Sequence, residues 1–346
     1  MNDNFKLPIH PEKITKKLFS TLPKRTKEVL ESRFGLGKNP KRMTLDAIGK
    51  GYGITRERVR QIEADGISRI KKSESIKEMA PVFTVLENYF EHNGQVIKES
   101  DVLSNLSPNS KSENHVYFLL SLHNSLLRFH ENESMYDRWI HGHSFHANTE
   151  RTLTSTISAL RKIGRPVSEE NLFQIAKDAS QSIVGAPAQR HVLQNWINIS
   201  KLISKNYFGE WGLVEFPSIK PRGVRDLSYL AMLRYGKPLH FADVAQQIEN
   251  ITGKKVHIQT VHNELIKDDR FVLVGRGLYA LSEWGYASGM VRDVICDILK
   301  VQGSATKDKI VSLVSQKRFV KPNTISINLE NKKYFKKLPD GGYTLV

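Results

Sequence analysis

Four segments of the chain follow one pattern, and this internal repeat limits the fold more than any other feature of the sequence. Each segment has an apolar helical stretch, a glycine turn and a second short helical stretch. The turn glycines are spaced by about 70 residues, at Gly94, Gly164, Gly236 and Gly303. Such a repeat predicts a series of small units that share one supersecondary structure.

The residues around these glycines are suited to helix ends. Glycine readily adopts the left-handed conformation that ends a helix. Ser168 and Thr306 are suited to open the next helix, and acidic residues follow in its first turn. Apolar residues such as Leu172, Ile175 and Ala176 recur at helical spacing, so we expect them to face a small core.

A third helical stretch and a β-hairpin complete each repeat. Residues 268–281 (DDRFVLVGRGLYAL) and 332–346 (KKYFKKLPDGGYTLV) alternate apolar and polar residues around glycine turns. Residues 206–216 fit this pattern too, whereas the hairpin segment of the first repeat lacks glycine and fits it least. Three helices and a hairpin make a winged helix, so we predict four such units. We call them repeats 1 to 4, and they span residues 80–142, 147–218, 223–286 and 288–346.

Residues 1–75 are predicted to form a separate helical unit. Pro23 begins a helix that runs to Phe34. Thr44 and Thr55 each cap a later helix, and residues 51–53 form a tight glycine turn between them. This pattern predicts a helix-turn-helix. The expected fold class is therefore mainly α with small β wings: an N-terminal helix-turn-helix followed by about four tandem winged-helix domains.

The N-terminal unit resembles region 4 of the sigma-70 family, the −35-reading domain of bacterial RNA polymerase sigma factors. The matching runs are LPKRTKEVLESRFGL (22–36), TLDAIG (44–49) and ITRERVRQIEA (54–64). The resemblance implies double-stranded DNA with a −35-like element and the β flap of core RNA polymerase as partners. It implies base contacts by Arg56, Glu57, Arg60 and Gln61. For Arg60 it implies a contact to a phosphate as well as to a base. It implies DNA phosphate contacts by Arg25, Arg33, Thr44 and Arg58.

The chemistry of these side chains agrees with that reading. Arginine can donate two hydrogen bonds to guanine, glutamate can accept from the cytosine amino group, and glutamine can pair with adenine. Two residues depart from the family pattern. Asp65 stands where the family usually has lysine, and Gly66 replaces a good helix former at a cost of about 0.5–1 kcal/mol. We therefore expect weaker DNA contact at the distal end of this helix.

The positive charge of the chain is concentrated in two places. The formal net charge is +16, and an excess of this size points to a polyanionic partner or, alternatively, to a solvated basic surface. Residues 21–72 hold 14 Lys or Arg against 6 Asp or Glu, and repeat 4 holds 11 against 5. In repeat 4 we expect secondary DNA contacts by Lys317, Arg318, Lys321, Lys332 and Lys333.

Repeat 3 carries a second resemblance. The runs VHNELIKDDRFVLVGRG (261–277) and LSEWGY (281–286) resemble the HARE-type winged helix, which the delta subunit of bacterial RNA polymerase shares. Its third helix, expected at 259–267, offers candidate DNA-groove contacts. The adjacent Asp268 and Asp269 leave a protein-contact role open. The groove candidates are Gln259, Thr260, His262 and Asn263.

Several classes of function are not expected. Cys296 is the only cysteine, so the chain cannot form an internal disulfide or a cysteine metal cluster. No stretch approaches the roughly 18 apolar residues of a membrane helix. His130, His141, His143 and His146 lack the spacing of a zinc site. We expect a cytoplasmic, nucleoid-associated protein with no catalysis, cofactor, metal, membrane contact or small-molecule substrate.

The predicted function is that of a sequence-specific DNA-binding transcription regulator associated with bacterial RNA polymerase. No segment resembles the sigma region that melts the −10 element, so we do not expect the protein to start transcription alone. Two alternatives remain open at this stage. The chain could be a DNA-targeting accessory of a restriction or mobile-element system, or a polymerase-binding module that does not bind DNA.

Overall fold

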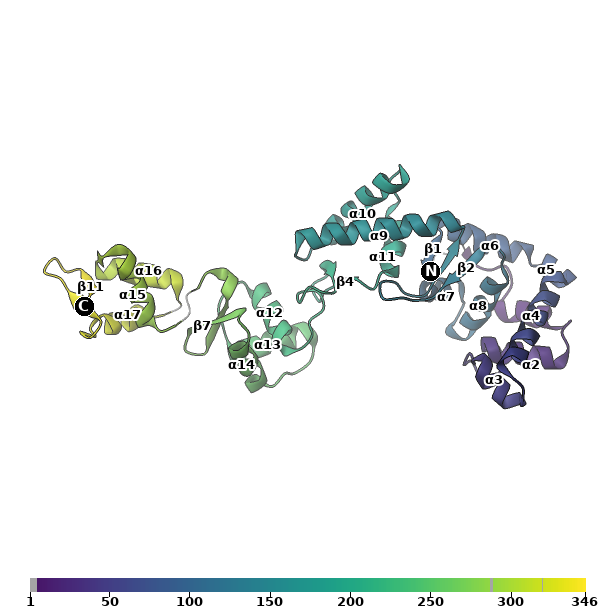
Figure 1. Ribbon diagram of the computed structural model, residues 1–346, viewed down its shortest axis with the longest axis horizontal. Coiled ribbons are helices and arrows are strands. Elements are labelled where there is room, and N and C mark those ends of the chain that lie inside the picture. Colours follow the sequence, from purple (N-terminus) through teal and green to yellow (C-terminus); the bar gives the residue numbers. More distant parts are fainter. Residues whose placement is uncertain (1–4, 287–288, 319) are drawn as a thin grey trace. The chain divides into compact units, whose positions relative to one another are not determined.

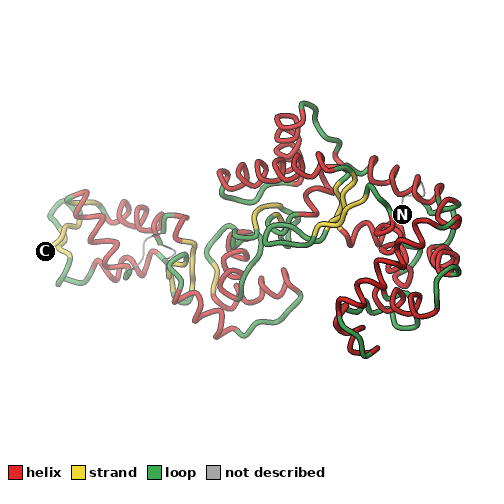
Figure 2. Tube along the Cα trace, turned by 45° about the vertical axis from the view of Figure 1, so that its right-hand side comes forward, coloured by secondary structure: helices red, strands yellow, loops and turns green. Residues whose placement is uncertain are grey.

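The computed structural model describes residues 5–286, 289–318 and 320–346, and it is mainly helical with small antiparallel sheets (Figures 1 and 2). Contacts divide the chain into two compact units. The first comprises residues 1–163 and 167–203, and the second comprises residues 164–166 and 204–346. The main division therefore falls inside repeat 2. None of the helices that the structure describes is both long and apolar enough to cross a membrane.

The N-terminal domain is a bundle of short helices. Thr44 Oγ1 accepts a hydrogen bond from the Ala47 N–H at 3.2 Å, and Thr55 Oγ1 accepts one from the Arg58 N–H at 3.2 Å. These two caps confirm the predicted helix-turn-helix. The helices are α1 (Pro11–Phe19), α2 (Lys24–Phe34), α3 (Leu45–Tyr52), α4 (Arg56–Lys72) and α5 (Glu74–Lys77).

Repeat 1 has a complete three-stranded sheet although its hairpin lacks glycine. The strand order is β1-β3-β2, and Ile140 pairs with Val96 on one side and Leu127 on the other. The missing glycine was therefore a poor guide to hairpin formation. The elements are α6 (Ala80–His92), β1 (Val96–Lys98), α7 (Glu99–Leu106), η2 (Ser110–Ser112), α8 (Glu113–Leu122), β2 (Leu126–Phe129) and β3 (Arg138–His141).

Repeat 2 departs most from the common pattern. Its sheet has two strands, and no strand is described between its first two helices. It consists of α9 (His143–Ile163), α10 (Glu169–Val184), α11 (Arg190–Ile199), β4 (Ile203–Lys205) and β5 (Trp211–Leu213).

Repeats 3 and 4 have the same strand order as repeat 1, with the last strand in the middle of the sheet. Repeat 3 comprises α12 (Val224–Tyr235), β6 (Leu239–His240), α13 (Phe241–Thr252), α14 (Ile258–Lys267), β7 (Phe271–Gly275), β8 (Leu278–Leu281) and η3 (Ser282–Trp284). Repeat 4 comprises α15 (Val291–Gln302), β9 (Ser304–Ala305), α16 (Lys307–Lys317), α17 (Pro322–Leu329), β10 (Phe335–Lys337) and β11 (Tyr343–Leu345). All four turn glycines have positive φ. Gly236 ends its helix in the left-handed conformation as predicted, whereas Gly303, with ψ −60°, lies outside that conformation.

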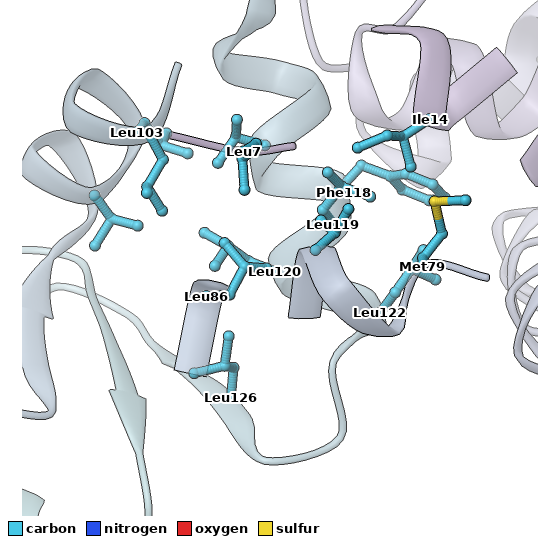
Figure 3. Packing of buried hydrophobic residues seen from close by; sticks show 14 of the residues in the cluster. Leu7, Ile14, Met79, Leu86, Leu103, Phe118, Leu119, Leu120, Leu122 and Leu126 are labelled. Atoms are coloured by element: carbon cyan, nitrogen blue, oxygen red, sulfur yellow. The ribbon is translucent and has the colours of Figure 1, made fainter. Parts of the chain in front are cut away.

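The N-terminal domain and repeat 1 share one hydrophobic core. Leu18 of α1, Leu30 of α2 and Ile70 of α4 belong to the same buried cluster as Leu86 and Phe118 of repeat 1. Figure 3 shows part of this packing around α8. The sequence predicts separate units with small cores, and that holds for repeats 3 and 4, which each have their own cluster. The N-terminal domain is instead built onto repeat 1.

Candidate nucleic-acid interface

Helix α4 presents one polar edge to solvent. Its opposite face is buried through Val59, Gly66 and Ile70, which pack into the domain. This amphipathic division leaves the first turns of the helix free for a partner. The exposed residues of those turns are Arg56, Glu57, Arg58, Arg60 and Gln61. Every residue predicted to contact bases therefore lies on one accessible edge.

Two pairs order these side chains along the helix. The Arg60 guanidinium donates to both carboxylate oxygens of Glu57, at 2.7 and 2.9 Å, and Arg58 Nη1 donates to Gln61 Oε1 at 3.1 Å. The hydrogen bond from Arg60 lowers the pKa of the Glu57 carboxyl group, so Glu57 remains an ionised acceptor. Exposed pairs of this kind are weak, so DNA can replace them at little cost.

The predicted phosphate contacts fall into two groups. Arg25, Thr44 and Arg58 are exposed. Arg33 is half-buried, donates to the Met43 carbonyl at 3.0 Å and pairs with Glu63 at 3.4 Å. These bonds tie Arg33 to the loop before α3 and to α4, and its predicted phosphate contact stays a prediction.

Gly66 marks a close crossing of α4 over α2. A Cβ atom at this position would lie 2.6 Å from Thr26 Cγ2 and 3.0 Å from Leu30 Cδ1. Both neighbours are buried. The sequence predicts a helix penalty here, and the structure adds that the penalty is offset by tight packing that a larger residue would prevent. The neighbouring Asp65 is exposed and pairs with Arg69 at 2.7 Å.

We expect Gly66→Ala to destabilise the first unit by about 1–3 kcal/mol, because overpacking outweighs the gain of about 1 kcal/mol in helix propensity. Gly51→Ala is the matched control. Gly51 lies in α3 with no atom within 4 Å of an added Cβ, so this change should stabilise by about 0.4–1 kcal/mol. Urea unfolding measures both effects. Stabilisation by both substitutions would contradict the crossing argument.

The third helices of the four repeats differ sharply in accessibility. All 10 residues of α8 are buried or half-buried, and Arg190 is the only exposed residue of α11. In α14 and α17, by contrast, a full face is open. The exposed residues of α14 include Gln259, Thr260 and Asn263, and those of α17 include Asn323 and Thr324. A helix must be accessible to enter a DNA groove, which disfavours α8 and α11.

Helix α8 is covered by the N-terminal domain. The Phe118 ring packs edge-on against Phe19 and Phe34, with centroid distances of 5.3 and 4.9 Å. The Arg42 guanidinium lies 3.6 Å from the centre of the Tyr117 ring. The helix that would read DNA in a free winged helix here serves as a packing surface.

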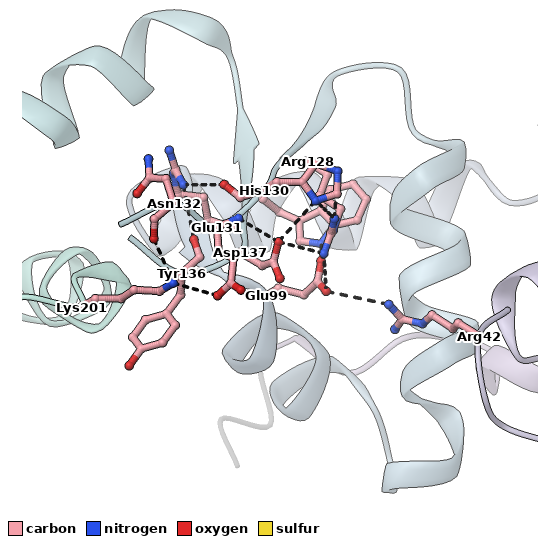
Figure 4. A network of polar contacts seen from close by, with 11 residues as sticks. Arg42, Glu99, Arg128, His130, Glu131, Asn132, Tyr136, Asp137 and Lys201 are labelled. Carbon is pink, nitrogen blue, oxygen red and sulfur yellow. Dashed lines mark hydrogen bonds and ion pairs between the residues drawn. The ribbon is translucent and has the colours of Figure 1, made fainter. Parts of the chain in front are cut away.

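A polar network reinforces this junction (Figure 4). The Glu99 carboxylate accepts from Arg128 Nε at 2.5 Å and Nη2 at 3.1 Å, and from Trp139 Nε1 at 2.9 Å. Arg42 of the N-terminal domain lies 3.8 Å from the same carboxylate. Glu99 therefore joins α7, β2 and β3 to the loop before α3.

The hairpin of repeat 1 is engaged by the segment from α11 to β4. The Tyr136 N–H of the hairpin loop donates to the Ile199 carbonyl at 2.9 Å, and Trp196 Nε1 donates to the carbonyl of Gly94, in the turn before β1, at 3.1 Å. Lys201 Nζ, shown in Figure 4, donates to Glu131 Oε2 at 2.9 Å. Both the third helix and the hairpin of repeat 1 are thus occupied within the first unit.

The predicted contacts in repeats 3 and 4 are mostly exposed. His262 of α14 is half-buried and stacks on Phe241 at 4.3 Å. Arg318 is the exception in repeat 4, since it is only 6% exposed and donates to the Leu273 carbonyl at 3.2 Å. Its burial argues against a DNA contact. The accessible lysines of the predicted set are Lys317, Lys321, Lys332 and Lys333.

Fold and exposed edge together define residues 24–72 as a helix-turn-helix domain of the DNA-reading class. Comparison with known proteins identifies the family of this domain, because residues 18–72 match the family model of sigma-70 region 4. A sigma-70 region 4 domain therefore occupies this part of the chain.

Three sigma factors are similar to this segment. RNA polymerase sigma factor RpoS of Coxiella burnetii is 50% identical over 50 residues, which are 14% of this chain and 14% of that protein. RNA polymerase sigma factor SigA of Clostridium acetobutylicum is 40% identical over 63 residues, 18% of this chain and 16% of the relative. SigA of a Bacillus species is 40% identical over 62 residues, with the same shares. The chain thus matches only 14–16% of the length of these relatives.

Proposed function

We propose that the protein is a sequence-specific DNA-binding transcription regulator that acts with bacterial RNA polymerase. In this proposal α4 reads a −35-like element in the major groove. The observation that carries it is the single exposed edge of α4, which holds donors and acceptors for base edges within a region 4 domain. Arg25, Thr44 and Arg58 are proposed to contact the DNA backbone beside it.

We further propose that the region 4 domain contacts the β flap of core polymerase. The surface available for this contact is largely polar. Among the large hydrophobic residues of α2, α3 and α4, Tyr52 alone is well exposed, at 38%. The apolar side of the domain is already covered by repeat 1. A flap contact would therefore depend on charged side chains and on Tyr52.

The repeats are proposed to be winged helices with different tasks. Repeat 1 supports the region 4 domain through α8, and repeat 2 packs on repeat 1 through α11. Repeat 4 would supply secondary backbone contacts through Lys317, Lys321, Lys332 and Lys333. Repeat 3 is proposed to be of the HARE type because of its runs at 261–277 and 281–286; its helices and sheet order are those that repeats 1 and 4 also have. The exposed Ile258 and Ile266 of its third helix favour contact with a protein over DNA.

A promoter footprint with and without core polymerase tests this function. Protection of the −35 region that is strengthened by core polymerase supports the proposal. Sequence-specific protection that is indifferent to polymerase would instead favour a DNA-targeting accessory of a restriction or mobile-element system. Polymerase binding with no DNA protection at all would favour a pure interaction module.

We expect Arg56→Ala and Gln61→Ala each to weaken binding to the cognate duplex by about 1–3 kcal/mol and to relax base preference at one position. Arg69→Ala is the matched control. Arg69 is exposed on the same helix but lies beyond Asp65, with which it pairs. Its removal should leave base preference unchanged. Titration of labelled cognate and substituted duplexes measures these effects, and unchanged preference in both variants would refute the role of α4.

A further inference from the structure

Asn114, the second residue of α8, makes three hydrogen bonds to the loop that joins α2 to α3. Its Nδ2 donates to the carbonyls of Gly35 at 3.0 Å and Pro40 at 2.6 Å. Its Oδ1 accepts from Arg42 Nε at 2.8 Å. One side chain of repeat 1 thus fixes the start, middle and end of a loop that lies more than 70 positions earlier in the sequence.

The fit between Asn114 and this loop is tight. Gly35 has φ of +65°, and a Cβ there would lie 2.6 Å from both Asn114 Nδ2 and the Pro40 carbonyl oxygen. Arg42 is further held by the Tyr117 ring and by Glu99. The loop has few alternatives to this conformation as long as α8 stays in place.

The loop leads directly into the proposed DNA surface. It carries the exposed Lys38 and Lys41 and ends at Thr44, the cap of α3. A helix N-terminus with nearby lysines suits a DNA phosphate. A further hydrogen bond joins the two parts beyond the other end of α8. Lys71 Nζ, at the end of α4, donates to Asn124 Oδ1 at 2.8 Å. Repeat 1 therefore holds the helix-turn-helix at two points.

We propose that α8 of repeat 1 has exchanged DNA reading for the positioning of the region 4 domain, and that Asn114 is the positioning residue for the backbone contact at the loop and the α3 N-terminus. Asn114 touches no DNA in this arrangement. It acts by keeping Lys38, Lys41 and Thr44 where they meet one phosphate, so that this backbone contact is lost without it. The inference rests on the proposed function and concerns phosphate contact, not base reading.

The test is Asn114→Ala in the full chain, titrated with a cognate and a scrambled duplex over a range of salt. We expect about a 5- to 10-fold loss of affinity at 0.1 M salt for both duplexes. The slope of log K against log salt should shrink by about 0.9, the share of one phosphate. The ratio of cognate to scrambled affinity should stay the same. A residue with a merely structural role would not change the slope selectively.

Asn109→Ala is the matched control, because Asn109 caps η2 and bonds only within repeat 1, to Ser112. It should leave affinity and slope unchanged. Asn114→Asp is the second variant. It keeps the acceptor for Arg42 but turns a carboxylate oxygen toward the carbonyls of Gly35 and Pro40, so the loop should move away and the smaller slope should be reproduced. Hydrogen exchange in residues 36–44 should accelerate in both Asn114 variants, with residues 56–72 unchanged.

Wild-type affinity and slope in both Asn114 variants would overturn the inference. A changed ratio of cognate to scrambled affinity would also overturn it, because base reading would then depend on Asn114. Failure of the proposed function looks different. In that case Arg56→Ala and Gln61→Ala leave the preference for the cognate duplex unchanged, whatever the Asn114 variants do.

Discussion

Replacing Phe118 by alanine is expected to lower the free energy of unfolding of the first unit by about 3–5 kcal/mol. The ring is fully buried in α8 and packs edge-on against one phenylalanine of α1 and one of α2. The substitution would leave a cavity where the N-terminal domain meets repeat 1 and would remove two aromatic pairs. Urea unfolding followed by tryptophan fluorescence measures the loss, with Trp139 and Trp196 reporting on this unit.

Phe118→Leu is the control for this prediction. Leucine keeps most of the buried volume and should cost clearly less than alanine. The comparison separates the cavity from the loss of aromatic contacts. A loss of less than about 1 kcal/mol for alanine would mean that the shared core does not hold the two parts together.

The second large effect is expected at Glu99. Glu99→Ala should destabilise the first unit by about 2–5 kcal/mol, because it leaves charged and polar groups of the junction without their acceptor. Arg128 and the Trp139 indole lose direct hydrogen bonds, and Arg42 loses its carboxylate neighbour. The pKa of Arg128 is raised chiefly by its hydrogen bond to Glu99, so that guanidinium stays charged and needs a new partner.

Two further variants test the prediction for Glu99, one with an intermediate expected effect and one as a control. Glu99→Gln keeps an acceptor for the indole N–H but removes the charge, so its loss should lie between wild type and alanine. Glu133→Ala, at an exposed position of the hairpin loop in the same repeat, should change stability by no more than about 0.5 kcal/mol. Equal stability of Glu99→Ala and Glu133→Ala would show that Asp137, 3.0 Å from Arg128, compensates fully.

Local signals in the sequence predicted much of this structure. The caps at Thr44 and Thr55 and the glycine turns depend on a few adjacent residues, so they could be predicted without knowledge of the fold. The exposed edge of α4 follows from the helical spacing of Val59 and its apolar partners. These features include every residue predicted to contact bases.

The tertiary junctions could not be predicted in this way. The close crossing of α2 at Gly66 and the bonds from Arg33 to Met43 and Glu63 depend on residues in other elements, which local patterns do not reveal. Asn114 carries no local signal at all, because its partners lie far away in the sequence. The sequence nevertheless holds one signal of this junction. The run VYFLLSL (116–122) of α8 is apolar on nearly all sides, which is typical of a helix covered all round.

The shared core of the region 4 domain and repeat 1 has a consequence for how the orientation of α4 could be controlled. Because Leu30 and Ile70 are buried together with Leu86 and Phe118, α4 cannot turn without repeat 1. A protein that bound repeat 1 would therefore also fix the orientation of α4, which it could not do if a flexible tether joined the two parts.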